Sequence, residues 1–132
     1  MKETLTDILN TPISPELLPL DEKGEIKQDT EKVIGPYVLH DFFLYHFLRY
    51  GANIKKIYFL AKIVFKDDYK EDEIKACLKL FIKRFFTQQF KRNCLPDGIK
   101  VGSVALSPRG DLRMSSDTYY GMYLKELENL WK

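Results

Sequence analysis

The sequence predicts a small all-α bundle of about four helices, with long irregular segments at residues 10–36 and 91–116. Apolar residues recur every three or four positions through the centre of the chain, which is the helical period. Gly, Pro, Asn or Asp stands at the ends of these stretches, as at helix boundaries. The one strand-like piece is residues 99–106. We therefore expect the apolar faces of short helices to bury one another.

The first helices follow from these boundary residues. A short helical turn is expected at residues 2–9, before a proline-rich irregular segment. Gly35-Pro36 precedes a helix at residues 37–50, because Pro suits the first turn of a helix, and Gly51 ends it. Asn53 is expected to cap the next helix.

The third central helix has the most regular pattern in the sequence. Asp68 is expected to cap it, with Glu71 as the partner of a capping box. A last amphipathic helix is expected from Ser116 or Asp117. The apolar stripe of the third helix comprises Ile74, Cys77, Leu78, Phe81, Ile82, Phe85 and Phe86, and that of the last comprises Tyr120, Tyr123, Leu124, Leu127, Leu130 and Trp131.

Composition narrows the class of protein. With 45% hydrophobic and 14% aromatic residues, the chain is not of the disordered class. The sequence contains no run of about 18 apolar residues, so no membrane span is predicted. The first residues do not resemble a signal peptide, so we expect a cytoplasmic protein. Cys77 and Cys94 have no metal-binding or disulfide-framework spacing and are expected to be reduced thiols.

Charge is unevenly distributed although the net charge is only +2. Residues 1–32 carry eight acidic residues against four lysines. Residues 79–113, here called the basic segment, carry eight basic residues against two acidic ones, a balance of +6. Such a segment should attract an anion, either a small phosphate-bearing ligand or a nucleic-acid backbone.

The residue types that often form sites show no complete pattern here. His40 and His46 are six positions apart and do not share a helix face, which favours packing over metal ligation. Cys77 falls in an apolar stripe. Cys94 follows two cations, a setting typical of reactive thiols, but no histidine follows it to serve as a base. Arg109-Gly110-Asp111 is interpreted as a turn, and no glycine-rich phosphate loop is present, so neither a catalytic residue nor a metal ligand is assigned.

Four ordered blocks nevertheless resemble one enzyme family. Residues 11–17 (TPISPEL) are similar to the signature that opens a mobile loop over the active site of NAD synthetases. Residues 35–41 (GPYVLHD) resemble the start of the next helix in that family. Residues 89–101 and 106–117 resemble the closing segment of its long, glutamine-dependent branch.

The resemblance implies a role in making NAD. In this family ATP, with Mg²⁺, adenylylates deamido-NAD, and ammonia then displaces AMP; in the long branch a separate amidase domain releases the ammonia from glutamine. Only the C-terminal end of the synthetase domain is matched, and its parallel sheet and Ser-Gly-Gly-x-Asp-Ser phosphate loop have no counterpart here. The chain would supply a lid-like loop at 1–36 and a helical part at 37–132, bind no cofactor alone, and be inactive without the remaining synthetase and amidase domains.

The resemblance also implies residue roles. Ser14 matches the hydroxyl residue that contacts ATP, and Lys91 matches the lysine that contacts deamido-NAD. Phe90 stands where the ammonia-dependent branch has a histidine, so that role is not transferred. The possible supporting residues in the matched blocks are Arg92, Arg109, Asp111 and Arg113.

Two other hypotheses remain open. A small all-α module could use the basic segment to bind nucleic acid or another polyanion, with steep salt dependence. Alternatively, uncovered apolar stripes could drive self-association. Under the leading hypothesis we expect a homo-oligomer that binds neither membranes nor nucleic acid.

Overall fold

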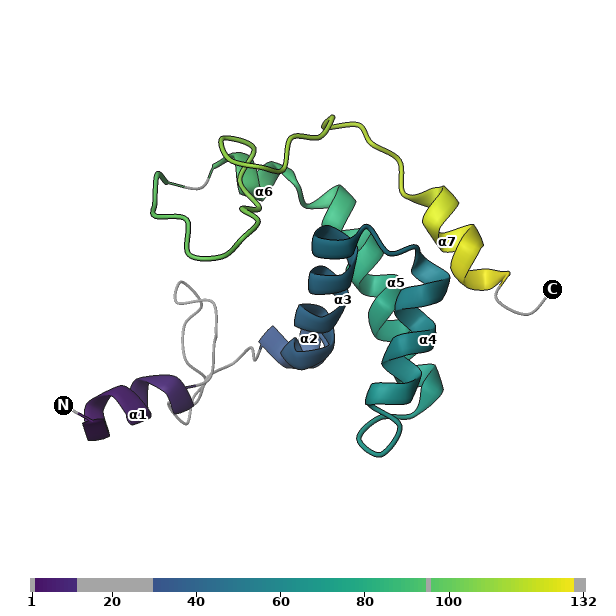
Figure 1. Cartoon of the computed structure of the whole chain (residues 1–132), viewed down its shortest axis with the longest axis horizontal. Coiled ribbons are helices and arrows are strands. Elements are labelled where there is room, and N and C mark those ends of the chain that lie inside the picture. The colour runs from purple at the N-terminus through teal and green to yellow at the C-terminus, as the bar shows by residue number, and fades with distance from the viewer. Residues whose placement is uncertain (1, 12–29, 95, 130–132) are drawn as a thin grey trace, which may run out of the picture. The chain divides into compact units, whose positions relative to one another are not determined.

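A computed structural model describes residues 2–11, 30–94 and 96–129, and within these ranges it contains seven helices and no strand (Figure 1). The all-α prediction is therefore confirmed, whereas the strand-like piece at residues 99–106 is irregular. The helices are α1 (Lys2–Asn10), α2 (Thr30–Ile34), α3 (Tyr37–Tyr50), α4 (Ile54–Val64), α5 (Glu71–Thr87), α6 (Phe90–Asn93) and α7 (Gly121–Glu128). The chain divides into two compact units, Met1–Tyr37 and Val38–Lys132.

The first unit contains α1 and α2. Helix α1 matches the helical turn expected at residues 2–9, and none of its side chains is buried. Helix α2 falls in a stretch that the sequence predicts as irregular, and its five residues show no apolar period that could have indicated it. Glu31 in α2 accepts a hydrogen bond from the Tyr37 backbone N–H at 2.8 Å, satisfying one of the donors left open at the start of α3.

The hydrophobic core lies in the second unit. Helices α4, α5 and α7 contact one another, and α3 joins them through its aromatic side chains. The buried positions follow the helical period on each helix, as expected when apolar faces drive the packing. They are Leu39 and Phe43 on α3; Ile54, Ile57, Tyr58 and Ala61 on α4; Ile74, Cys77, Leu78, Phe81, Ile82, Phe85 and Phe86 on α5; and Leu127 on α7.

Aromatic rings connect α5 to its neighbours. The ring centroids of Phe43 and Phe81 are 5.7 Å apart, and those of Phe47 and Phe85 are 5.3 Å apart with a T-shaped geometry. Phe86 stacks on a tyrosine of α7 with centroids 5.0 Å apart. Aromatic pairs in these arrangements add to the burial energy of the rings.

Two of the helix boundaries test the capping predictions. Asn53 caps α4 as expected, because its Oδ1 accepts a hydrogen bond from Lys56 N–H at 2.9 Å. The Asp68 prediction is wrong, since its N–H donates to Phe65 O at 3.1 Å in the turn that follows α4. Helix α5 begins after Lys70, whose N–H donates to a carboxylate oxygen of Glu73 at 2.9 Å, so the acidic capping partner is Glu73 and not Glu71.

The last helix begins later than the sequence predicts. Residues 115–118 form a turn, in which Thr118 N–H donates to Ser115 O at 3.3 Å; residues 119 and 120 are irregular, and α7 starts at Gly121. Leu127 is buried as expected, whereas Leu130 and Trp131 lie outside the described residues. In the described part of the chain, no helix is both long enough and apolar enough to cross a membrane.

Candidate functional site

The basic segment comprises the second half of α5, α6 and the loop of residues 94–113. Part of its positive charge faces carboxylates. Three of its eight cations form ion pairs with carboxylates, two of them within the segment itself. These pairs are Lys79 with Glu128 at 3.3 Å, Lys100 with Asp111 at 2.6 Å and Arg109 with Asp97 at 2.5 Å.

Arg92 is directed towards the protein and not towards solvent. Its Nη2 donates to the Phe85 carbonyl at 2.9 Å and lies 3.4 Å from the sulfur of Met114. The guanidinium also lies over the Phe85 ring, 4.6 Å from its centroid, which is a cation–π geometry. Burial lowers the pKa of Arg92. Its charge is thus used inside the molecule.

Lys91, the next residue along α6, has the opposite environment. Its side chain is exposed, and no carboxylate of the described residues lies within ion-pair distance of its ammonium group. Phe90 beside it is also 55% exposed. A compact ammonium group without a partner carboxylate is well suited to a ligand phosphate or carboxylate.

The loop borders an open hollow of about 620 Å³ lined by residues 96–100, 105–107, 109 and 110. Asp111 organises the loop around it by accepting hydrogen bonds from Lys100 Nζ and from Ala105 N–H, the latter at 2.7 Å. These two bonds, the lysine first, lower the pKa of Asp111. Gly110 N–H donates to Ser107 O at 3.0 Å, which confirms that Arg109-Gly110-Asp111 lies in a turn.

The remaining predicted residues lie close to this turn or outside the described residues. Arg109 N–H donates to the Ser107 hydroxyl at 3.2 Å, and Arg113 Nε donates to the Pro108 carbonyl at 3.1 Å. Both arginines are exposed residues of the loop. Ser14 is among the residues whose placement is not described.

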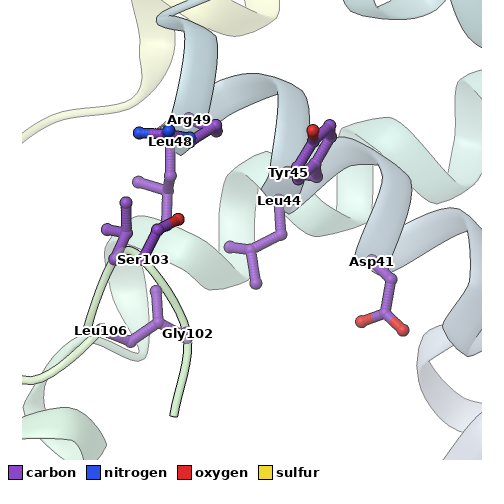
Figure 2. Close-up of a pocket in the computed structure, with 9 residues that line it drawn as sticks. Asp41, Leu44, Tyr45, Leu48, Arg49, Gly102, Ser103 and Leu106 are labelled. Carbon is purple, nitrogen blue, oxygen red and sulfur yellow. The ribbon is translucent and has the colours of Figure 1, made fainter. Parts of the chain in front are cut away.

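A second, smaller hollow of about 250 Å³ lies between α3 and residues 102–106. Figure 2 shows Leu44 and Leu48 of α3 on the side of the helix that faces the loop residues Ser103 and Leu106. Its polar lining residues on α3 are Asp41, Tyr45 and Arg49. Sequence reasoning missed them, although their spacing of four residues places them on one helix face.

Cys77 and the two histidines have packing roles, whereas Cys94 does not. Cys77 is buried in the core, as predicted, and burial raises the pKa of its thiol to about 11. Its sulfur lies 3.5 Å from His40 Nε2, and His46 packs on Phe42 with ring centroids 4.3 Å apart. Cys94 is exposed. Within the described residues, no three His, Cys, Asp or Glu side chains gather in a way that could hold a metal ion.

Comparison with known proteins identifies relatives. The chain is 39% identical to the glutamine-dependent NAD(+) synthetases of Mycobacterium leprae and Mycobacterium tuberculosis, and each match covers 96% of this chain. It spans only 21% of the length of each enzyme. No family model matches the chain. The chain is therefore homologous to about a fifth of these synthetases, which confirms the resemblance inferred from the sequence.

Proposed function

We propose, from this homology, that the chain acts as the C-terminal part of a glutamine-dependent NAD synthetase. In that enzyme ATP activates deamido-NAD, and ammonia released from glutamine completes the amide of NAD. The observation that carries the proposal is the 39% identity over 96% of the chain. The chain would contribute the lid-like segment 1–36 and one wall of the substrate site, while the remaining synthetase and amidase domains supply the rest.

Lys91 is the residue that we assign to deamido-NAD. Its ammonium group is exposed and has no carboxylate partner among the described residues, so an incoming anion need not displace an existing contact. Arg109 forms an ion pair with Asp97, which is 91% exposed. Exposed ion pairs contribute little to stability, so exchange of this carboxylate for a substrate phosphate would cost little.

ATP would be contacted from the lid by Ser14, whose hydroxyl can donate to a phosphate or ribose oxygen. Magnesium accompanies ATP as part of the co-substrate. The described residues offer no cluster of three ligands for it, so we assign the metal no site on them. Because the sequence contains no phosphate-binding glycine loop, we expect the isolated chain to be inactive.

A hybrid enzyme tests the proposal. This chain would replace the homologous fifth of the Mycobacterium tuberculosis synthetase, and NAD formation from deamido-NAD, ATP and glutamine would be measured. We expect an active hybrid and an inactive isolated chain. Lys91→Ala should raise the KM for deamido-NAD by about 10- to 100-fold, the loss expected for a charge-assisted hydrogen bond. Lys56→Ala, which removes an exposed lysine of α4, is the matched control.

Three results would contradict parts of this proposal. A folded hybrid without activity would remove the assignment to the synthetase. An unchanged KM in Lys91→Ala would remove the substrate role of that lysine. NAD formation by the isolated chain from deamido-NAD, ATP and ammonia would contradict its expected inactivity, because the chain would then not need a phosphate-binding loop from another domain.

The polyanion-binding alternative is less well supported by the ion pairs of the basic segment. Three of its cations already face carboxylates, and the guanidinium of Arg92 is partly buried. We therefore expect no steeply salt-dependent binding to single-stranded or duplex DNA. A binding constant that falls steeply with salt concentration, corresponding to the release of several counterions, would support the alternative instead.

Self-association is proposed on a different surface. Phe59 and Ile63 of α4 are 60% and 55% exposed, although α4 also has a fully apolar inner face. A helix that is apolar on both sides is usually covered on both. Sedimentation velocity across a range of concentrations should show a homo-oligomer, and Phe59→Lys should shift it towards the monomer. A strict monomer at all concentrations would contradict this.

A further inference from the structure

Helix α6 and the residue before it present two different faces. Gln89 and Arg92 are three positions apart and therefore lie on the same side of a helix. Gln89 is only 5% exposed, and within the described residues it is the one buried polar side chain. Phe90 and Lys91, between them, are exposed. The inward side thus makes contacts within the protein, while the outward side presents the proposed substrate lysine.

The inward contacts reach residues far along the chain. The Gln89 side-chain amide donates to the Ser115 carbonyl at 2.5 Å, across 26 positions of sequence. A buried amide costs free energy when it has no partner, so this bond favours the arrangement in which Ser115 stays beside Gln89. The bond connects the end of the loop to the start of α6.

Arg92 makes the second connection. Its guanidinium spans from the Phe85 carbonyl and ring on α5 to the sulfur of Met114. A flat guanidinium can stack on a ring and donate at its edge at the same time. Arg92 therefore joins α5, α6 and the loop in one contact.

Apolar side chains support these polar contacts. Leu106, Leu112 and Met114 are partly buried against the core. Residues 107–111, which include the turn that carries Arg109, lie between Leu106 and Leu112. The loop is thus attached on both sides of its most exposed part.

We propose that Gln89 and Arg92 are positioning residues, which hold residues 112–115 against the end of α5 and so fix Lys91 relative to the loop that carries Arg109 and Arg113. This inference rests on the proposed function, in which Lys91 contacts deamido-NAD. Cations that are already held in place lose less conformational entropy when the substrate binds. Arg92 would therefore act through its shape and contacts, and not as a charge offered to the substrate.

Hydrogen exchange of the full chain tests the attachment itself. Gln89→Ala should speed exchange of the Thr118 backbone amide, which donates to the same Ser115 carbonyl as Gln89, by about tenfold, the effect of losing a buried hydrogen bond. Gln88→Ala is a matched control, because Gln88 is a neighbouring glutamine that is not buried and makes no side-chain hydrogen bond to the described residues. Circular dichroism should show equal helix content in both variants. Equal exchange in both variants would overturn the proposal.

Kinetics of the hybrid enzyme test the consequence. Gln89→Ala and Arg92→Lys should each raise the KM for deamido-NAD by about five- to tenfold, again the scale of a lost buried hydrogen bond, and leave the KM for ATP within about twofold. Simple loss of folded enzyme would instead lower the rate without changing either KM. Arg84→Ala, an exposed arginine of α5, should leave both KM values unchanged.

Arg92→Lys separates positioning from direct contact. Lysine keeps the positive charge but lacks the planar group that stacks on Phe85, so a positioning role predicts that Lys does not rescue the enzyme. Full activity in Arg92→Lys would show that only the charge matters and would overturn the proposal. If Lys91→Ala raises the KM while Gln89→Ala does not, positioning fails and the proposed function stands. If Lys91→Ala has no effect, the proposed function itself fails, whatever hydrogen exchange shows.

Discussion

The inner face of α5 and the loop of residues 94–116 are neighbours in sequence, yet they are held in different ways. Seven buried side chains of α5, all apolar, pack against the surrounding helices. The described residues of the loop have no regular backbone pairing and depend on a few directional bonds, among them those of Gln89, Arg92 and Asp111. The packing energy of the core is spread over many weak atomic contacts, whereas the loop depends on a few hydrogen bonds, each of which one substitution can remove. Changes in the core should therefore affect global stability, and changes in the loop should affect local order and binding.

The largest expected effect comes from the core. Phe43 is fully buried and packs on Phe81. Phe43→Ala should lower the free energy of unfolding by about 3–5 kcal/mol, because burial energy is lost and a cavity remains. Urea denaturation would measure it, with Met122→Ala, at a 79% exposed position of α7, as a control expected within about 0.5 kcal/mol of the wild type. Equal losses in the two variants would show that the buried and exposed faces of the helices are misassigned.

Thiol reactivity contrasts the same two regions. Burial raises the pKa of Cys77 to about 11, so only about 0.1% of it is thiolate at pH 8, and the thiolate is the reactive form. Cys94 is exposed in the loop. Iodoacetamide should modify Cys94 about a hundredfold faster, as mass spectrometry would show, and Cys94→Ser should leave a chain that reacts only on unfolding. Equal labelling of the two thiols in the folded chain would contradict the core assignment.

A pair of glycines tests where backbone conformation matters. Gly51 ends α3 with φ of +57°, whereas Gly98 in the loop has no positive φ, and neither position has an atom within 4 Å of an added Cβ. Gly51→Ala should cost about 1–2 kcal/mol, because only glycine adopts this conformation without strain. Gly98→Ala should cost less than about 0.5 kcal/mol. Thermal unfolding of the two variants would measure both losses of stability. Equal costs would place the α3 boundary elsewhere.

The smallest expected effect is the pH dependence of the loop. Lys100 and the Ala105 N–H hold the pKa of Asp111 below its usual value. Because the folded pKa is lowered, the contact stabilises the loop at neutral pH and is lost as the pH falls through that lowered pKa. The Ala105 amide resonance should therefore shift only in acid, below about pH 4. In Asp111→Asn the acid-dependent shift should disappear, and a shift retained in that variant would assign it to another carboxyl group.

The sequence predicts the helices better than it predicts their ends or the loop contacts. The stripe of α5 was predicted in full because a 3.6-residue period can be read from residue types alone. Its start was not, because Asp68 lies in the turn after α4, where its N–H bonds to Phe65, and the helix begins only after Lys70. The roles of Gln89 and Arg92 were also invisible, since their partners Ser115 and Met114 are more than 20 positions away.

By itself, the sequence determined that this protein is helical, where its apolar faces lie, and which family it resembles, because periodicity and motif order are local properties of the chain. Only the tertiary structure decided which cations remain available. It pairs Arg109 with Asp97 and Lys100 with Asp111, turns Arg92 inward and leaves Lys91 exposed. A charge can be counted along a sequence, but whether it faces a carboxylate, a ring or solvent depends on segments that meet only after folding.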